Sequence, residues 1–222
     1  MRHSAIMIEP EERLITQADS KNLARQILGN RHHSRIVVAI DGACGTGKSV
    51  ISSILFNTIR REIGNIAHVS TDSDVLSRAD RKPGTNVMDW HGDDMVKEIM
   101  QNPGAEFHWE AYGLQGKTKN DVIHIATPEI GIVILEGLHA IEKTLKYQGR
   151  DDEIIAINVT VPEEIRERRR KIRNIETGRW NAKEADEREK YQRATIRDYY
   201  EDLRKKLGAN TGTRTATFSR LK

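Results

Sequence analysis

Residues 35–49 read RIVVAIDGACGTGKS, and this stretch decides the fold of the chain. Residues 35–40 form a short run dominated by apolar, β-branched side chains, which is typical of a strand buried on both faces of a parallel sheet. Residues 42–49 fit the pattern G-x-x-x-x-G-K-S. Apolar side chains then recur at helical spacing and predict a helix over residues 47–61. A glycine-rich loop between a buried strand and a helix is the setting in which this pattern binds phosphate.

Residues 42–49 have the chemistry of a phosphate cradle. Glycines let backbone N–H groups approach phosphate oxygens without an intervening Cβ, and the N-terminus of the next helix adds partial positive charge. We expect Lys48 to reach the β- and γ-phosphates of a nucleotide, and Ser49 to present its hydroxyl to Mg²⁺. Cys44 is interpreted as a small filler rather than a reactive thiol. The predicted nucleotide-binding residues are Gly42, Ala43, Cys44, Gly45, Thr46, Gly47, Lys48 and Ser49.

Further strands and helices alternate along the rest of the chain. Buried-type strands are predicted at residues 66–69, 132–135 and 154–161, with helical stretches between or after them. A leading helix is predicted over residues 16–28 and a last edge strand over residues 213–218. This order predicts the α/β class, with a mainly parallel sheet of the P-loop NTPase type and helices on both of its faces.

Two segments stand outside this alternation. Residues 106–127 contain the runs FHWEAY and VIHIAT around a polar turn, which predicts a small β-hairpin excursion beside the sheet and a wall for a substrate. Residues 162–181 are charged and helical, and we predict that they form a lid region. We expect residues 1–222 to form a single domain, with residues 1–34 as an N-terminal helical extension.

Acidic residues follow the second and third predicted strands. The carboxyl ends of parallel strands form the edge where ligands bind in open α/β folds. Asp72 is the predicted base, which accepts the proton of an attacking hydroxyl or holds a metal-bound water, whereas Asp74 is expected to cap the next helix. Glu136 occupies the location of a Walker B acid, and with Ser49 and Asp72 it completes the predicted Mg²⁺ ligands. His139 is either a structural histidine or a substrate contact.

The run EEIRERRRKIR at residues 163–173 holds six basic and three acidic residues. Arg166, Arg169, Arg170 and Arg173 are spaced so that they share one face of a helix. Because the run follows the fourth strand, it predicts a lid whose guanidinium groups close over the transferring phosphate. We expect Arg166 and Arg170 to bind the nucleotide. A solvated helix face is the alternative interpretation.

Composition and missing motifs exclude several classes of protein. No window of this chain, with 31% charged residues, approaches the roughly 18 uninterrupted apolar residues of a membrane-spanning helix. A single cysteine excludes an intramolecular disulfide framework and a thiolate zinc site. The net charge of +3 argues against nucleic acid as a main partner. The N-K-x-D motif of switch GTPases is absent. No secretory signal is recognisable, so we expect a cytoplasmic protein.

The ordered motifs resemble those of the phosphoribulokinase/uridine kinase family of P-loop kinases over about residues 35–200. The motifs are AIDGACGTGKS, STDS at residues 70–73, VILEGLHA at residues 133–140, and R-x-x-R-R-x-x-R-N followed by Gly178 and Arg179. The resemblance implies transfer of the γ-phosphoryl group of ATP to the hydroxyl of a small molecule, with Asp72 as general base. It also implies that Lys48 and Ser49 contact phosphate and metal, and that Arg169 and Arg173 are catalytic lid arginines.

The chain departs from uridine kinases where the acceptor is recognised. Residues 72–75 read DSDV in place of Asp-Ser-Phe-Tyr, and the stretch Asn-Phe-Asp-His-Pro is only echoed around Asp89. Tyr112 matches a tyrosine of the base pocket, but Lys117 stands where a histidine is expected. Trp109 is either a further wall of this pocket or part of the core. These departures argue against recognition of uracil, while a nucleoside stays among the predicted acceptors.

Basic residues around this region suit a more anionic acceptor. Lys117 and Arg78, with Arg81 and Lys82, would bind a group such as a sugar phosphate, and solvated loop charges are the alternative interpretation. The predicted acceptor-binding residues are Asp72, Arg78, Asp89, Tyr112, Lys117, Glu136 and His139.

The sequence thus predicts a kinase with ATP and Mg²⁺ as cofactors and a nucleoside, sugar or sugar phosphate as acceptor. The alternatives are a P-loop ATPase that couples hydrolysis to a regulatory partner and a nucleotide-binding module with little catalysis. A preference for ATP over GTP and assembly into a homo-oligomer both stay open.

Overall fold

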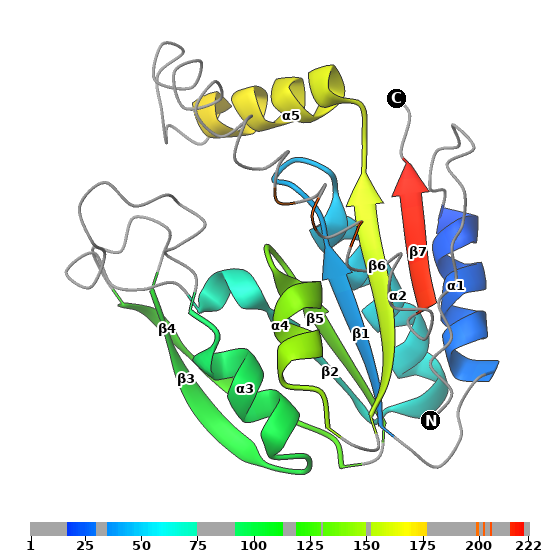
Figure 1. Ribbon diagram of the computed structural model, residues 1–222, viewed down its shortest axis with the longest axis vertical. Helices are drawn as coiled ribbons and strands as arrows, with labels where there is room; N and C mark the ends of the chain where they lie inside the picture. The colour runs from blue at the N-terminus through cyan, green and yellow to red at the C-terminus, as the bar shows by residue number, and fades with distance from the viewer. Residues whose placement is uncertain are drawn as a thin grey trace.

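A five-stranded parallel sheet forms the centre of the computed structural model, with the strand order β2-β5-β1-β6-β7 (Figure 1). The structure describes residues 17–29, 35–74, 92–112, 119–129, 131–149, 152–176, 199, 202, 205 and 214–219. The strands of the sheet are β1 (Ile36–Asp41), β2 (Ile66–Ser70), β5 (Ile132–Glu136), β6 (Glu153–Thr160) and β7 (Arg214–Ser219). The predicted α/β class is confirmed, and β7 is the predicted edge strand.

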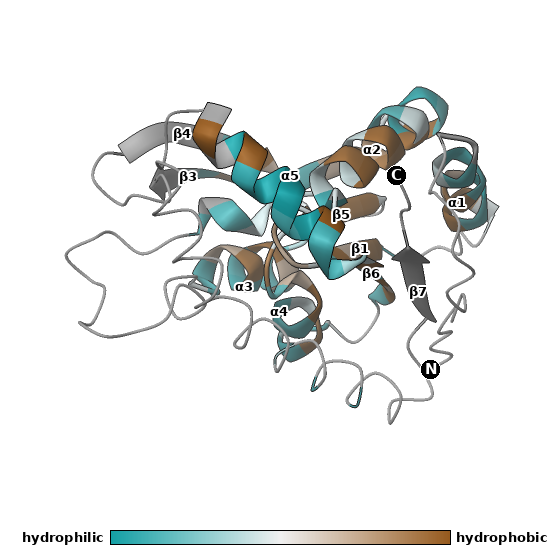
Figure 2. Cartoon of the chain, turned by 90° about the horizontal axis from the view of Figure 1, so that it is seen from above, coloured by the Kyte–Doolittle hydropathy of each residue, from teal (hydrophilic) through white to brown (hydrophobic). Residues whose placement is uncertain are grey.

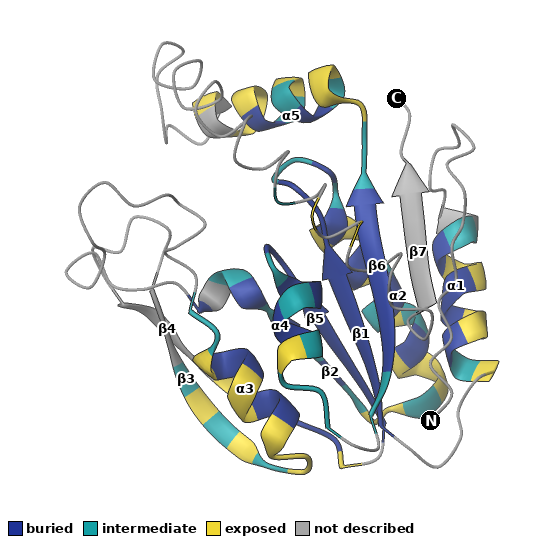
Figure 3. Cartoon of the chain, in the orientation of Figure 1, coloured by how far each residue is buried: buried dark blue, intermediate teal, exposed yellow. Residues whose placement is uncertain are grey.

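Helices cover both faces of the sheet (Figure 2). On one face lie α1 (Gln17–Gly29) and α2 (Lys48–Ile63), and on the other lie α3 (Asp94–Gln101) and α4 (Ala140–Lys146). Successive side chains of a strand point to opposite faces, so a strand between two helical layers must be apolar throughout. All residues of β1 and β5 are buried accordingly (Figure 3).

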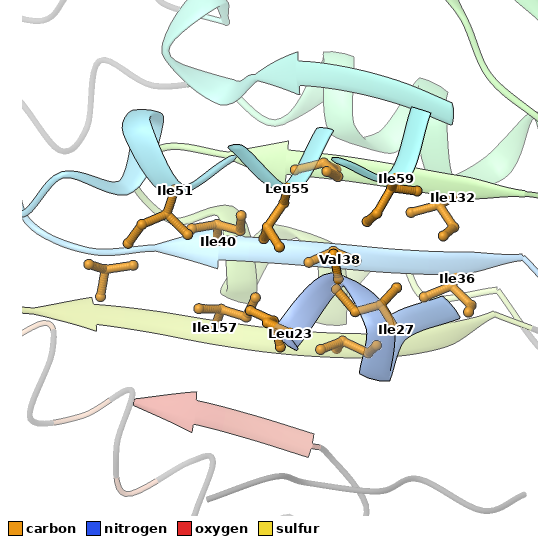
Figure 4. Close-up of a cluster of buried hydrophobic side chains, with 14 residues drawn as sticks. Leu23, Ile27, Ile36, Val38, Ile40, Ile51, Leu55, Ile59, Ile132 and Ile157 are labelled. Carbon is orange, nitrogen blue, oxygen red and sulfur yellow. The ribbon is translucent and has the colours of Figure 1, made fainter. Parts of the chain in front are cut away.

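The larger core lies between the sheet and the helices α1 and α2 (Figure 4). Leu23 and Ile27 of α1 and Leu55 of α2 pack there against Val38 and Ile157 of the sheet. The opposite face carries the smaller side chains of Ala39 and Ala156 where α4 packs. Side chains of β1 thus alternate between the two faces: larger ones pack against α1 and α2, and the smaller Ala39 packs against α4.

The predicted excursion is a separate antiparallel hairpin of β3 (Glu106–Tyr112) and β4 (Lys119–Ala126). Phe107 and Trp109 pack against the core cluster that contains α3, and Ile125 is buried within that cluster. His108 and His124 are exposed on the other face of the hairpin. Of the two interpretations of Trp109, the structure supports the one that places it in the core.

The arginine-rich helix α5 (Glu163–Glu176) follows β6 and lies across the carboxyl edge of the sheet (Figures 1 and 2). The buried residues of α5 lie along the side of the helix that faces the sheet (Figure 3). The predicted lid region continues to residue 181, and residues 177–181 lie outside the described part of the chain. Across the residues that the structure describes, no helix combines the length and the apolar character needed to span a membrane.

A buried ion pair closes the amino edge of the sheet. Arg35 precedes β1 and makes two hydrogen bonds of 2.8 Å to the carboxylate of Asp152, which precedes β6. The same guanidinium donates to the main-chain oxygens of Ile99 and Met100 at the end of α3, both at 2.9 Å. Arg35 thus ties two strands to a helix C-terminus, where positive charge also complements the helix dipole.

We expect Arg35→Leu to lower the free energy of unfolding by about 3–5 kcal/mol, because it leaves the buried Asp152 carboxylate without its partner. The double variant Arg35→Leu with Asp152→Leu should recover part of that loss, since no buried charge remains. Urea titration of the three proteins measures both quantities. Equal stability of Arg35→Leu and wild type would contradict the prediction.

Candidate active site

The phosphate loop joins β1 to α2 and needs its glycines. Gly45 and Gly47 have φ angles of +92° and +96°, which side-chain-bearing residues rarely adopt. A Cβ on Gly45 would lie 2.7 Å from the main-chain oxygen of Arg166 in α5. The hydroxyl of Thr46 donates to the oxygen of Ala43 at 2.9 Å and closes the turn. The loop is therefore a tight cradle that touches the predicted lid helix.

Lys48 and Glu136 carry opposite charges and come from the start of a helix and the end of a strand. Lys48 begins α2, Glu136 ends β5, and both are buried. Burial lowers the pKa of Lys48, but Cys44, Asp72, Glu136 and Asp41 outweigh it, and the pKa of Lys48 is raised overall. Burial raises the pKa of Glu136, which Asp72 raises further, against the opposing effect of Lys48.

Ser49 lies next to this pair. Its hydroxyl donates to a carboxylate oxygen of Glu136 at 3.1 Å, while the serine itself is exposed. A hydroxyl and a carboxylate oxygen side by side are ligands of the type that Mg²⁺ prefers. Searched over the described residues, the chain has no group of three or more His, Cys, Asp or Glu side chains that could hold a metal ion.

Asp72 lies on a short 3₁₀ turn, η1 (Thr71–Ser73), directly after β2. Its carboxylate accepts the Leu138 N–H at 3.4 Å, and the Thr71 hydroxyl donates to the Leu138 oxygen at 3.1 Å. Gly137 has a φ of +142°, and a Cβ there would lie 2.1 Å from the Thr71 hydroxyl. Because Gly137 permits this approach, the half-buried Asp72 lies beside the end of β5 that carries Glu136.

Asp74 has the capping role that the sequence predicts. Its buried carboxylate accepts the N–H of Met95 in the first turn of α3 at 3.2 Å. Burial raises the pKa of Asp74, and the Met95 N–H and Lys143 oppose that effect. Asp74 therefore connects the turn that carries Asp72 to the start of α3.

The arginines of α5 differ in their surroundings. Arg166 is buried, pairs with Glu163 through hydrogen bonds of 3.1 and 2.5 Å, and donates to the main-chain oxygen of Cys44 in the phosphate loop at 3.4 Å. Arg170 is also buried, Arg169 is half-buried, and Arg173 is exposed. The helix thus rests on the phosphate loop through the face of Arg166 and Arg170. The catalytic role of Arg169 and Arg173 stays a prediction.

His139 precedes α4 in a left-handed conformation, with a φ of +61°. Its Nδ1 lies 3.4 Å from a carboxylate oxygen of Glu142, and its ring meets the edge of the Tyr199 ring at 4.3 Å between centroids. Burial lowers the pKa of His139. Its Nε2 is buried without a hydrogen-bond partner among the described residues. These contacts favour the structural interpretation of His139, and its substrate role stays a prediction.

Sequence reasoning missed Asp41 and Tyr199 at the base of the phosphate loop. Asp41 is fully buried, and one of its oxygens accepts the Gly42 N–H at 2.7 Å. The other accepts the Ile141 N–H at 3.3 Å and the Tyr199 hydroxyl at 3.1 Å. Burial raises the pKa of Tyr199, and Asp41 raises it further. An acid between an apolar strand and a glycine was the available signal for Asp41.

We expect Tyr199→Phe to lower the free energy of unfolding by about 1.5 kcal/mol, because it removes a hydrogen bond to a charged, buried carboxylate. Tyr147→Phe is a matched control: its hydroxyl also binds an aspartate, Asp93, which is only half-buried. Urea denaturation should give the larger loss for Tyr199→Phe. A smaller loss there than in the control would contradict the prediction.

Part of the predicted acceptor site lies outside the described residues. This applies to Arg78, Asp89 and Lys117, as well as to Arg81 and Lys82. Tyr112 ends β3, and its backbone pairs with Lys119 of β4. The acceptor contacts of these residues therefore remain predictions.

No family model matches the chain, and no curated protein matches it in sequence. Solved structures match its fold. The YGR205w protein is 15% identical with a TM-score of 0.62, over 92% of this chain and 95% of that one. A possible uridine kinase from Bacillus stearothermophilus is 15% identical with a TM-score of 0.52, over 67% and 84%. A D-glycerate 3-kinase from Cryptococcus neoformans is 13% identical with a TM-score of 0.52, over 81% and 86%.

These comparisons define the class of fold. The chain has the P-loop fold that these solved structures share, with its glycine-rich loop between β1 and α2. The predicted resemblance to the phosphoribulokinase/uridine kinase family is confirmed at the level of the fold.

Proposed function

We propose that the protein is an ATP-dependent kinase of the phosphoribulokinase/uridine kinase family, which transfers the γ-phosphoryl group to a hydroxyl of a small molecule. The observation that carries the proposal is the position of Asp72 beside the end of β5, close enough to Lys48 and Glu136 for their charges to interact. A carboxylate next to a phosphate cradle can take the proton of an acceptor hydroxyl. The similarity in fold to kinases of small molecules supports the same activity.

The residues present fit MgATP. A Cβ at Gly42 or Gly45 would lie 2.5 Å from the main-chain oxygen of Val159 or 2.7 Å from that of Arg166, so the loop needs glycine at both positions. Main-chain N–H groups of such a glycine-rich loop can bind phosphate oxygens. Lys48 supplies a buried positive charge, and Ser49 with Glu136 supplies a hydroxyl and a carboxylate for a divalent cation. Mg²⁺ held by the Ser49 hydroxyl and the Glu136 carboxylate would offset the negative charge of the phosphates.

The chain's own residues then have distinct tasks in the transfer. Main-chain N–H groups of the loop and Lys48 bind the phosphates and stabilise the charge on the equatorial oxygens of the γ-phosphoryl group. Asp72 accepts the proton of the acceptor hydroxyl while the oxygen of that hydroxyl forms a bond to the γ-phosphorus. The bond from the γ-phosphorus to the β–γ bridging oxygen breaks, and ADP leaves. Helix α5 covers the loop through Arg166 and limits the access of water, which would otherwise compete as acceptor.

We propose a nucleoside, a sugar or a sugar phosphate as the class of acceptor. The fold neighbours include a possible uridine kinase and a D-glycerate 3-kinase, which are named for a nucleoside and a small hydroxy acid. The basic residues Arg78 and Lys117 favour an anionic acceptor. The proposal treats residues 1–222 as one kinase domain that acts in the cytoplasm.

The test is ADP release by the purified protein with MgATP, without acceptor and with uridine, cytidine, ribulose 5-phosphate, D-glycerate or simple sugars. Mass spectrometry of the mixture identifies the phosphorylated product, and MgGTP in place of MgATP measures the preference for the base. We expect one acceptor class to stimulate release, and Asp72→Asn to abolish that stimulation.

The alternative function is a P-loop ATPase that drives a regulatory partner. It predicts steady hydrolysis that no acceptor stimulates and that Asp72→Asn leaves unchanged. That pair of results would overturn the kinase proposal.

A further inference from the structure

Lys143 is a buried lysine at the junction of α4, α3 and the turn that carries Asp72. It is 6% exposed, and its ammonium donates to the main-chain oxygen of Gly92, which lies just before α3. In the sequence it is one of the two lysines of α4, and it belongs to none of the motifs. An ammonium group keeps its charge in such a place only when acidic groups compensate for the lost water.

The compensating groups come from three parts of the fold. Burial lowers the pKa of Lys143 overall, and the carboxylates of Asp74, Asp93, Asp72 and Asp41 oppose that effect, in descending order. Asp72 and Asp74 belong to the turn after β2, Asp93 precedes α3, and Asp41 ends β1. Helices α3 and α4 lie side by side on this face of the sheet (Figures 1 and 2). Lys143 is thus the cation at the centre of an acidic junction.

Hydrogen bonds connect this junction to the turn of Asp72. The Asp74 N–H donates to the main-chain oxygen of Thr71 at 3.1 Å, and the main-chain oxygen of Asp74 accepts the Gly92 N–H at 2.7 Å. A Cβ on Gly92 would lie 2.8 Å from the Asp74 carboxylate. The N–H of Gly92 therefore donates to Asp74, and its main-chain oxygen accepts from Lys143. Through Gly92, α4 is connected to Asp74 and so to the turn that carries Asp72.

We propose that Lys143 is a positioning residue for phosphoryl transfer: it holds Gly92 and Asp74 against α4 and so fixes the turn on which Asp72 lies. This inference rests on the proposed function, in which Asp72 is the base. A second set of hydrogen bonds joins the turn to Leu138. The Asp72 carboxylate accepts the Leu138 N–H, and the Thr71 hydroxyl donates to the Leu138 oxygen. Contacts on both sides of the turn restrict the position of the Asp72 carboxylate. A displacement of a catalytic group by about 1 Å from the reactive geometry costs about 100-fold in rate.

The first test is Lys143→Met, which keeps an unbranched side chain one heavy atom shorter and removes the charge and the hydrogen bond. We expect kcat for phosphoryl transfer to fall by about 10- to 100-fold, with the KM for MgATP within about threefold of wild type. Lys146→Met is the matched control, because Lys146 lies on the same helix but is exposed. A kcat of Lys143→Met equal to that of the control would overturn the proposal.

A second variant separates positioning from stability. In Lys143→Met with Asp74→Asn, no uncompensated carboxylate remains at Asp74, so we expect the midpoint of thermal unfolding to recover towards wild type. The Gly92 oxygen still lacks its donor, and we therefore expect kcat to stay low. If the double variant recovers kcat together with stability, Lys143 has only a structural role.

Amide hydrogen exchange measures how firmly the turn of Asp72 is held, and it needs no catalytic assay. The Leu138 N–H is protected through the Asp72 carboxylate and the Met95 N–H through Asp74. In Lys143→Met we expect both to exchange at least about tenfold faster, while the Ile134 N–H inside β5 is unchanged. Unchanged exchange at Leu138 would overturn the proposal. Absence of transfer by wild type to any acceptor would instead overturn the proposed function.

Discussion

Asp72→Asn is expected to lower kcat for phosphoryl transfer by about 10³-fold, because an amide cannot take the proton of the acceptor hydroxyl. The asparagine oxygen can still accept the Leu138 N–H, so the turn should keep its place. The dissociation constant of MgATP should stay within about threefold of wild type. Single-turnover transfer and calorimetric titration of the nucleotide measure the two quantities separately.

Asp94→Asn is the control for this variant. Asp94 is exposed in the first turn of α3 and belongs neither to the phosphate loop nor to the end of β5 that carries Glu136. We therefore expect Asp94→Asn to leave kcat unchanged. Loss of nucleotide binding in Asp72→Asn, with transfer per bound nucleotide unchanged, would show that Asp72 acts in binding and would contradict its role as base.

Lys48→Met is expected to weaken MgATP binding by about 10- to 100-fold, since a charged hydrogen bond to phosphate contributes about 1.5–3 kcal/mol. The loss of Lys48 also leaves buried acids uncompensated. Those acids are Asp41, Asp72 and Glu136, whose charges raise the pKa of Lys48 in the native protein. Without Lys48, which opposes the effect of burial on Glu136, the pKa of Glu136 should rise further. Calorimetric titration with MgATP measures the loss of affinity.

Lys97→Met, an exposed position on α3, controls for loss of positive charge in general. Its affinity for MgATP should equal that of wild type. An affinity of Lys48→Met equal to the control's would exclude the loop as the phosphate site. Circular dichroism at the titration temperature checks that both variants are folded.

Much of the fold follows from local sequence patterns. The strands buried on both faces are continuous apolar runs, and the phosphate loop has its own pattern of glycines, lysine and serine. Parallel strands place their carboxyl ends at one edge, so the approach of Asp72 and Glu136 could be predicted without coordinates. The spacing of the arginines likewise predicts that Arg166 and Arg170 lie on one face of a helix.

Other parts of the site depend on contacts between distant segments. Lys143 could not be distinguished from the lysines around it, because only the packing of α3 against α4 buries it among aspartates. Tyr199 reaches Asp41 across more than half of the chain, and no local spacing predicts that bond. Trp109 had two interpretations, and its packing beside α3 decided between them.

By itself, the sequence determined the class of fold and the place of the phosphate loop, because periodicity and loop chemistry act between near neighbours. Only the tertiary structure decided which charges are buried and what compensates them, as at Lys48, Lys143 and Arg35. The free energy of a buried charge depends on the groups that surround it in space, and here those groups come from separate strands and helices.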